Sequence, residues 1–125
     1  MKHPALRGCS VLVVEDEPLI ALDIVTALEL AGAHATTTTT VRHALILVEH
    51  DGLSAAIMDH ALRDGDSTQL CARLKARGIP YVSYSGFGPV KGASSDSIHI
   101  SKPATMDVLM SAVEGLLAGR SPRTS

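Results

Sequence analysis

The 125-residue chain has a formal net charge of -2, 46% hydrophobic residues and only 2% aromatic residues. This length predicts a single domain over residues 1–125, with an ordered core at about 8–119, a flexible N-terminal arm and a flexible tail at 120–125. The small charge argues against direct DNA binding and against attachment to an anionic membrane, and no apolar run is long enough to span a membrane. Cys9 and Cys71 lack disulfide or metal-site spacing, which favours free thiols and a cytoplasmic location.

Strands and helices are predicted to alternate from the N-terminus. The apolar, β-branched run at 10–15 predicts a buried strand, and the helical spacing of apolar residues predicts a helix over about 18–31. Residues 33–38 predict a weaker strand, because they are rich in threonine. Thr40 is a candidate N-cap for a helix over 41–50.

The second half of the chain continues the alternation. Residues 53–59 form another apolar run that ends on an acid and is followed by a turn. A helix is predicted over 67–77 and a strand over 81–85. A short strand at 97–100 and a helix over 106–119 complete the pattern.

Alternating strands and helices of these lengths predict an α/β domain whose parallel sheet is covered by helices on both faces. Five strands give a doubly wound, flavodoxin-like sheet with the order 2-1-3-4-5. Residues 86–96 are rich in glycine and serine and lack helical spacing, so the helix between the last two strands should be shortened or irregular. Ligands of such sheets bind beyond the carboxyl ends of the strands.

Polar residues with complementary chemistry stand at these strand ends. They are Glu15, Asp16, Asp59, Ser85 and Lys102. Clustered carboxylates repel one another unless a cation neutralises them, and oxygen ligands without histidine or cysteine suit Mg2+. Asp59 is therefore a candidate nucleophile for phosphoryl transfer, with the Lys102 ammonium and the Ser85 hydroxyl binding phosphoryl oxygens.

Four short motifs occur in order at the predicted strand ends: VVEDEP, AIMDHALRDGD, VSYSG and ISKP. Together they resemble the motifs of a response regulator receiver domain, and the resemblance covers nearly the whole chain. It implies that a sensor histidine kinase or a histidine phosphotransfer protein donates a phosphoryl group to Asp59. It also implies that Mg2+ is held by Asp16, Asp59 and the backbone carbonyl of Ala61. Glu15 would hold metal-bound water, and Lys102 would pair with the phosphoryl group.

The resemblance further assigns residues to the conformational switch. Ser85 would move toward the phosphoryl group, and Pro103 would follow a cis peptide bond. His99 occupies the position of the usual aromatic switch residue, so a rotating tyrosine is not expected there. Tyr84 or Phe87 would substitute for it, and Phe87 would also shield the phosphoryl group from water.

The short interval at 86–96 resembles a receiver sub-type in which SGYG-like residues follow the switch hydroxyl. The common dimer surface of receivers is therefore not assumed, and we expect a monomer or a weak dimer. The leading hypothesis is a stand-alone receiver that is not an enzyme for external substrates. It would switch the binding of a downstream partner protein or pass the phosphoryl group on.

Two other functions remain open. One is a pseudo-receiver that binds partners without phosphorylation, against which the complete residue set argues. The other is a magnesium-dependent phosphohydrolase with an aspartate nucleophile, which would need a general acid where Ala61 stands. The six histidines lack the spacing of a zinc site, although His60 would be placed to tune phosphate lifetime.

Overall fold

The computed structural model describes residues 4–50, 52–59, 61–62, 65–66, 68–85, 97–101 and 105–120. For residues 61–62, 65–66, 84–85, 97–101 and 118–120 only the backbone is described. The elements, in chain order, are η1 (Pro4–Leu6), β1 (Ser10–Val14), α1 (Pro18–Leu30), β2 (His34–Thr38), α2 (Val41–Leu47), β3 (Ala55–Asp59), β4 (Ala61–Leu62), β5 (Gly65–Asp66), α3 (Thr68–Ala76), β6 (Tyr81–Ser85), β7 (Ser97–Ser101) and α4 (Met106–Arg120).

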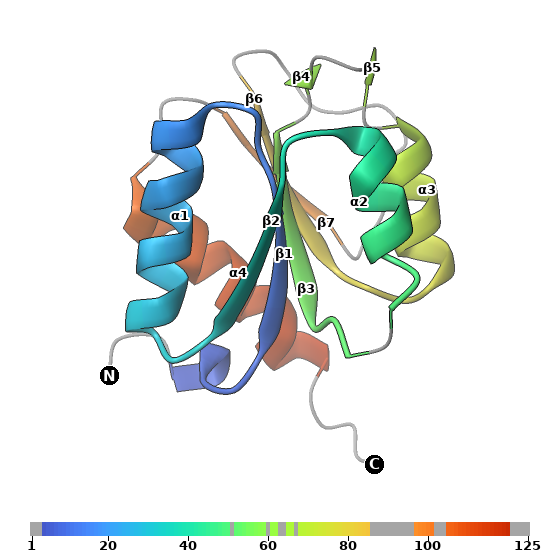
Figure 1. Cartoon of the computed structure of the whole chain (residues 1–125). Helices are drawn as coiled ribbons and strands as arrows, with labels where there is room; N and C mark the ends of the chain where they lie inside the picture. The colour runs from blue at the N-terminus through green and yellow to red at the C-terminus, as the bar shows by residue number, and fades with distance from the viewer. Residues whose placement is uncertain are drawn as a thin grey trace.

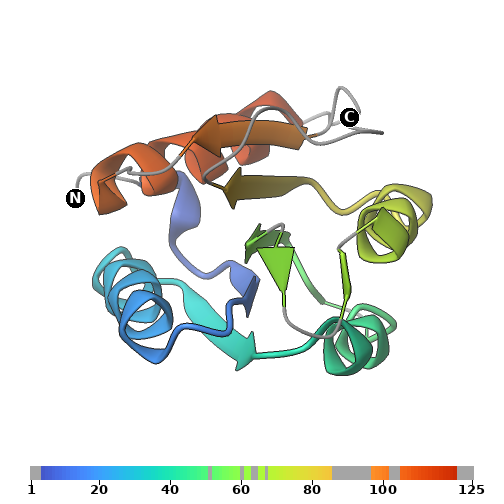
Figure 2. The same ribbon diagram turned by 90° about the horizontal axis from the view of Figure 1, so that it is seen from above.

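A parallel sheet with helices on both faces forms the body of the domain, as the sequence predicts. Within the described residues its strands follow the order β2-β1-β3-β6-β7 and are joined by four parallel pairings. Helices α1 and α4 cover one face, and α2 and α3 cover the other (Figures 1 and 2). The carboxyl ends of the strands lie at the upper end of the sheet in Figure 1.

The sheet divides the hydrophobic core into two layers. Alternate residues of β1 point to opposite faces, so Val11 and Val13 belong to the cluster under α1 and α4. Leu12 and Val14 belong to the cluster under α2 and α3. All four side chains are fully buried, which explains why β1 is apolar throughout its length.

The segment after β3 contains a short ribbon that the sequence does not predict. Here β4 and β5 form a separate antiparallel ribbon in which Ala61 pairs with Asp66 and Leu62 with Gly65. Each strand has two residues, too few to produce an alternating pattern in the sequence. The prediction of a shortened helix concerns residues 86–96, which lie outside the described residues.

The packed core begins before residue 8, in contrast to the flexible N-terminal arm that the sequence suggests. Leu6, in η1, is fully buried among residues of the layer under α1 and α4. The backbone N–H of Ala5 donates to Oε2 of Glu114 in α4 at 2.9 Å. Of the tail predicted to be flexible, only Arg120 is described, and it is the last residue of α4.

The helices begin where the sequence indicates, but α2 ends earlier. Pro18 occupies the first turn of α1, and Thr40 is the N-cap of α2, where its hydroxyl oxygen accepts the N–H of His43. Helix α2 stops at Leu47 instead of residue 50. Among the described residues no helix is long and apolar enough to cross a membrane. Cys9 and Cys71 are free thiols.

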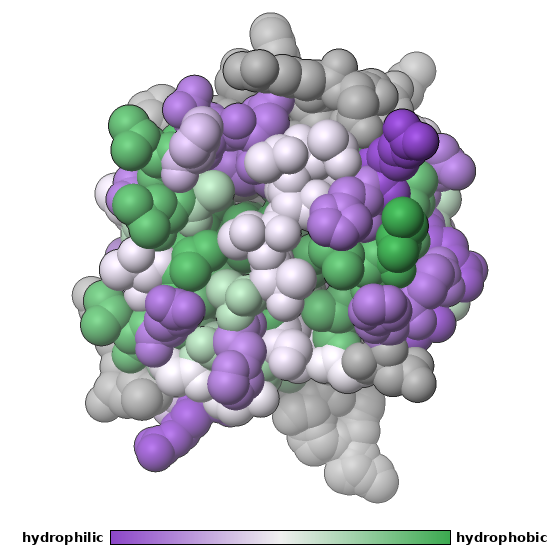
Figure 3. Space-filling model, in the orientation of Figure 1, coloured by the Kyte–Doolittle hydropathy of each residue, from purple (hydrophilic) through white to green (hydrophobic). Residues whose placement is uncertain are grey.

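Large apolar side chains also reach the surface. Leu19, Leu22 and Leu30 of α1 are exposed, and so are Ile46 and Val108. Figure 3 shows the α1 group as green areas on the left of the molecule. Isolated exposed leucines are common on folded proteins, so exposure alone assigns them no partner.

An ion-pair cluster joins the turn after α2 to the C-terminal part of α3. Both carboxylate oxygens of Glu49 accept hydrogen bonds from the Arg73 guanidinium, one of them at 2.7 Å from Nη2. Nη1 of Arg77 lies 3.5 Å from Glu49 Oε1. The hydrogen bond from Arg73, with the charges of both arginines, holds the pKa of Glu49 below its usual range despite some desolvation. The cluster is exposed, so salt should screen it.

Replacing Glu49 with glutamine is expected to reduce the stability of the domain slightly. Because the folded-state pKa of Glu49 is lowered, its contribution is present at neutral pH and is lost as the pH falls through that folded-state pKa. Urea denaturation at pH 7 in low and high salt should show a deficit that shrinks with salt. Glu29→Gln, the same change on the exposed side of α1, is the control; an equal deficit there would contradict a role for the cluster.

Candidate metal site

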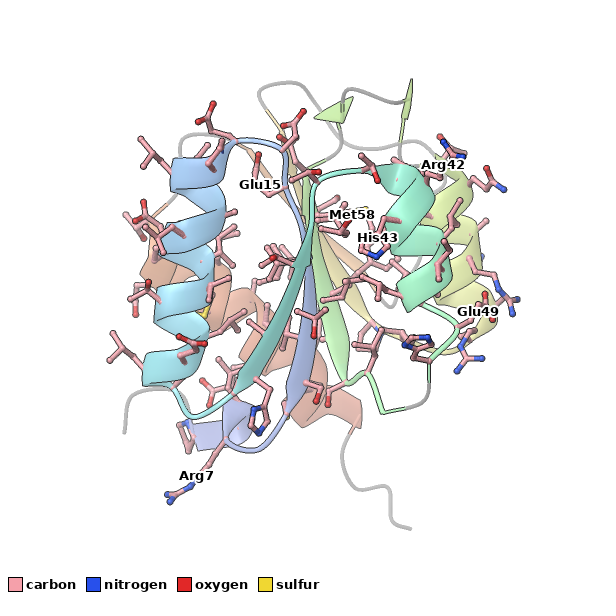
Figure 4. The ribbon with its side chains drawn as sticks, viewed as in Figure 1. Arg7, Glu15, Arg42, His43, Glu49 and Met58 are labelled. Carbon is pink, nitrogen blue, oxygen red and sulfur yellow. The ribbon has the colours of Figure 1, made fainter. Side chains whose placement is uncertain are left out.

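Three acidic residues meet at the carboxyl end of the sheet. Glu15 directly follows β1, Asp16 is the next residue, and Asp59 is the last residue of β3. β1 and β3 are parallel neighbours, so their ends lie side by side. Figure 4 labels Glu15 at this end of β1. Glu15 is 1% exposed and Asp59 is 6% exposed, whereas Asp16 is partly exposed.

The carboxylates of these residues form one cluster. One oxygen from each lies within 4.8 Å of the oxygens of the other two. Carboxylates this close repel one another, and burial strengthens the repulsion because water screens it less. A divalent cation relieves this, and a donor set of oxygens alone fits Mg2+, which takes one or two carboxylates and keeps several waters.

Backbone contacts hold Glu15 in place. Its N–H donates to the carbonyl of Thr38 at 3.0 Å, which extends the pairing of β1 with β2 beyond Val14. Its side-chain Oε2 accepts the N–H of Glu17, the N-cap of α1, at 2.9 Å. A carboxylate is favoured at a helix N-terminus. One oxygen of Glu15 therefore serves the helix start.

Asp59 is held by strand pairing and helix packing. It pairs with Tyr84 of β6, and the preceding Met58 pairs with Val14 of β1. The Sδ atom of Met58 lies 3.6 Å from Sγ of Cys71, which packs α3 against β3 immediately before the acid. The position of Asp59 is thus set by two neighbouring strands and by helix packing.

Of the other predicted residues, the backbone places Ser85 at the same end of the sheet. Ser85 ends β6 and pairs with Ser101, the last residue of β7. Ala61 is the first residue of β4. His99, in the middle of β7, pairs with Ser83 of β6. The side chains of Ser85 and His99 are not described, and Lys102, Pro103, Phe87 and His60 lie outside the described residues.

Two residues near the site have no role in the sequence-based interpretation. Thr38 ends β2, is 6% exposed, and has its hydroxyl 2.9 Å from Nδ1 of His43. The run of threonines at 36–40 indicates a strand and a cap, and nothing in it separates Thr38 from its neighbours. Only the fold shows that Thr38 lies beside Glu15.

The closest functional information comes from comparison with known proteins. No protein-family model matches the chain. SdrG from Sphingomonas melonis is 38% identical, with a TM-score of 0.75 over 88% of this chain and 97% of that chain. A response regulator receiver protein from Sinorhizobium medicae has a TM-score of 0.83 and 24% identity, and covers 92% of this chain and 98% of its own.

A further comparison concerns a receiver domain that belongs to a sensor histidine kinase. The receiver domain of a sensor histidine kinase from Pseudomonas aeruginosa, solved with a magnesium ion in its active site cleft, has a TM-score of 0.76. It is 20% identical and covers 89% of this chain and 98% of its own, a likeness that shows the fold.

The transcriptional regulatory protein TcrA from Mycobacterium tuberculosis is 29% identical over 120 residues, or 89% of this chain. The chain spans about half of that relative, 47% of its length. The parallel sheet, the acids at its carboxyl end and these likenesses lead to one conclusion. The chain belongs to the response regulator receiver family.

Proposed function

We propose that the chain is the phosphoacceptor of a two-component phosphorelay and that Asp59 receives the phosphoryl group. The observation that supports this most directly is the cluster of Glu15, Asp16 and Asp59, whose oxygens lie within 4.8 Å of one another at the carboxyl end of the sheet. Asp16, Asp59 and the backbone carbonyl of Ala61 would hold Mg2+, and Glu15 would hold a water on the metal. Mg2+ would neutralise charge on the phosphoryl oxygens.

Phosphoryl transfer requires mainly that the Asp59 carboxylate is correctly placed. A carboxylate oxygen of Asp59 attacks phosphorus in line with the bond from phosphorus to the histidine nitrogen of the donor. The new bond from oxygen to phosphorus forms as that bond breaks, and its electron pair returns to the histidine. Asp59 is 6% exposed, so little bulk water reaches its carboxylate.

Lys102 and Ser85 complete the proposal through their sequence positions. The β7 strand ends at Ser101, at the end of the sheet that carries Asp59, and Lys102 is the next residue in the sequence. An ammonium there would pair with the phosphoryl group. The Ser85 hydroxyl would bond another phosphoryl oxygen and move with it, which couples the modification to the surface around β6.

The proposed partners follow from the same chemistry. A donor must present a phosphohistidine, which is found on a sensor histidine kinase or a histidine phosphotransfer protein. A downstream protein would then recognise the phosphorylated surface, or the group would be passed on. The chain would act on its own phosphorylation and dephosphorylation, without turnover of an external substrate, in the cytoplasm.

The experiment is to incubate the protein with acetyl phosphate, with and without Mg2+, and to follow its intact mass. We expect an added phosphoryl group that requires Mg2+ and is removed by mild alkali or hydroxylamine, as an acyl phosphate should be. Beryllofluoride should shift the amide NMR signals around Asp59. No modification and no shift would favour a pseudo-receiver, and multiple turnover of a phosphate ester would favour a hydrolase.

A further inference from the structure

The corner between β2 and α2 contacts the acidic site through the main chain. The Thr38 carbonyl accepts the N–H of Glu15 at 3.0 Å. Both residues are nearly fully buried. This hydrogen bond lies one residue beyond the pairing of Val14 with Thr38. Any displacement of the Thr38 carbonyl would therefore move Glu15 and, with it, the adjacent Asp16.

Side-chain contacts hold that corner from the other side. The Thr38 hydroxyl lies 2.9 Å from Nδ1 of His43, which is on the first turn of α2 and is labelled in Figure 4. The backbone N–H of the same histidine donates to Oγ1 of Thr40 at 3.1 Å. A longer contact, 3.5 Å, joins the N–H of Thr40 to the Thr38 hydroxyl. His43 thus contacts both ends of the three-residue corner.

The formation of β2 does not require the hydrogen bond between the Thr38 hydroxyl and His43. Side chains of one strand alternate between faces, so Thr36 and Thr38 share a face of the sheet. Thr36 is exposed, whereas Thr38 is 6% exposed. Valine has nearly the shape of threonine and a high strand propensity, so β2 needs no hydroxyl at residue 38. The Thr38 hydroxyl matters because it contacts the imidazole ring of His43.

We propose that Thr38 and His43 are positioning residues for the metal site. Their side-chain hydrogen bond holds the Thr38 carbonyl where it receives the N–H of Glu15, and this sets the direction in which Glu15 and Asp16 enter the cluster. The inference rests on the proposed function, because its consequence is the affinity for Mg2+. Mg2+ demands near-ideal octahedral geometry, so a small displacement of its ligands weakens binding.

The test compares Mg2+ dissociation constants of matched variants by calorimetric titration. Thr38→Val removes the hydroxyl at nearly constant volume and should weaken Mg2+ binding about tenfold, the low end of the range for outer-shell partners. Thr38→Ser keeps the hydroxyl and should bind Mg2+ almost as well as the native protein. Thr36→Val, the same change two residues earlier on the same face, should leave the affinity unchanged.

A spectroscopic measurement separates positioning from general loosening of the fold. The 15N shift of Nδ1 in His43 should change in Thr38→Val and remain native in Thr36→Val and Thr38→Ser. If Thr38→Val does not fold, His43→Ala removes the other partner from an exposed helix position and should weaken Mg2+ binding in the same range.

The outcomes separate this inference from the proposed function. If the native protein takes up no Mg2+, the proposed function fails. If it binds Mg2+ and a folded Thr38→Val binds equally well, the positioning role is wrong while the function stands. Failure of Thr38→Ser to restore affinity would also overturn the role, because the effect would then come from the methyl group and not the hydroxyl.

Discussion

Replacing Asp59 with asparagine is expected to abolish the Mg2+-dependent acyl phosphate completely. The amide has nearly the volume of the carboxylate, but it is a poor nucleophile and a weaker ligand for Mg2+. The variant should fold, because it removes one of three clustered negative charges at a buried position and creates no cavity. Intact mass after incubation with acetyl phosphate measures the modification, and circular dichroism reports the fold.

The control for this substitution is Asp23→Asn. Asp23 lies on the exposed side of α1, so the same chemical change there should leave the modification at the native level. Persistent label in Asp59→Asn would place the acceptor at another residue and contradict the proposed mechanism. Loss of label in both variants would show that the charge of the molecule, and not Asp59 itself, controls the reaction.

The central part of the fold could be predicted from sequence because its signals are local and strong. β6 spans the predicted residues 81–85, and β1 and β3 lie within their predicted ranges. Parallel strands buried on both faces require apolar runs, and the acid that ends such a run falls at the carboxyl end of the sheet. Glu15, Asp16 and Asp59 were for that reason expected to converge, and the structure brings them together.

The remaining features depend on contacts between distant segments. The β4–β5 ribbon is too short to have a period. The hydrogen bond between Thr38 and His43 joins the end of a strand to the start of a helix. Nothing in the sequence around either residue indicates that contact. Leu6 lies in a short segment whose partner, α4, comes more than one hundred residues later, as the contact between Ala5 and Glu114 shows.

Leu6→Ala is expected to lower the free energy of unfolding by about 2–5 kcal/mol, the usual range for a fully buried leucine. Leu6 is 0% exposed and belongs to the same cluster as Leu28 and Val113, so its loss leaves a cavity between η1 and the helices. That is a large part of the roughly 5–15 kcal/mol by which such domains are stable. Urea denaturation followed by circular dichroism measures it.

Leu30→Ala provides the matched control, because Leu30 is 79% exposed at the end of α1 and its truncation should change stability by no more than about 0.5 kcal/mol. Equal effects of the two variants would show that the N-terminal segment does not pack as described. The η1 segment lies at the opposite end of the sheet from Glu15 in Figure 4. Folded Leu6→Ala should therefore bind Mg2+ with native affinity, because its cavity leaves the contacts of the acidic cluster intact.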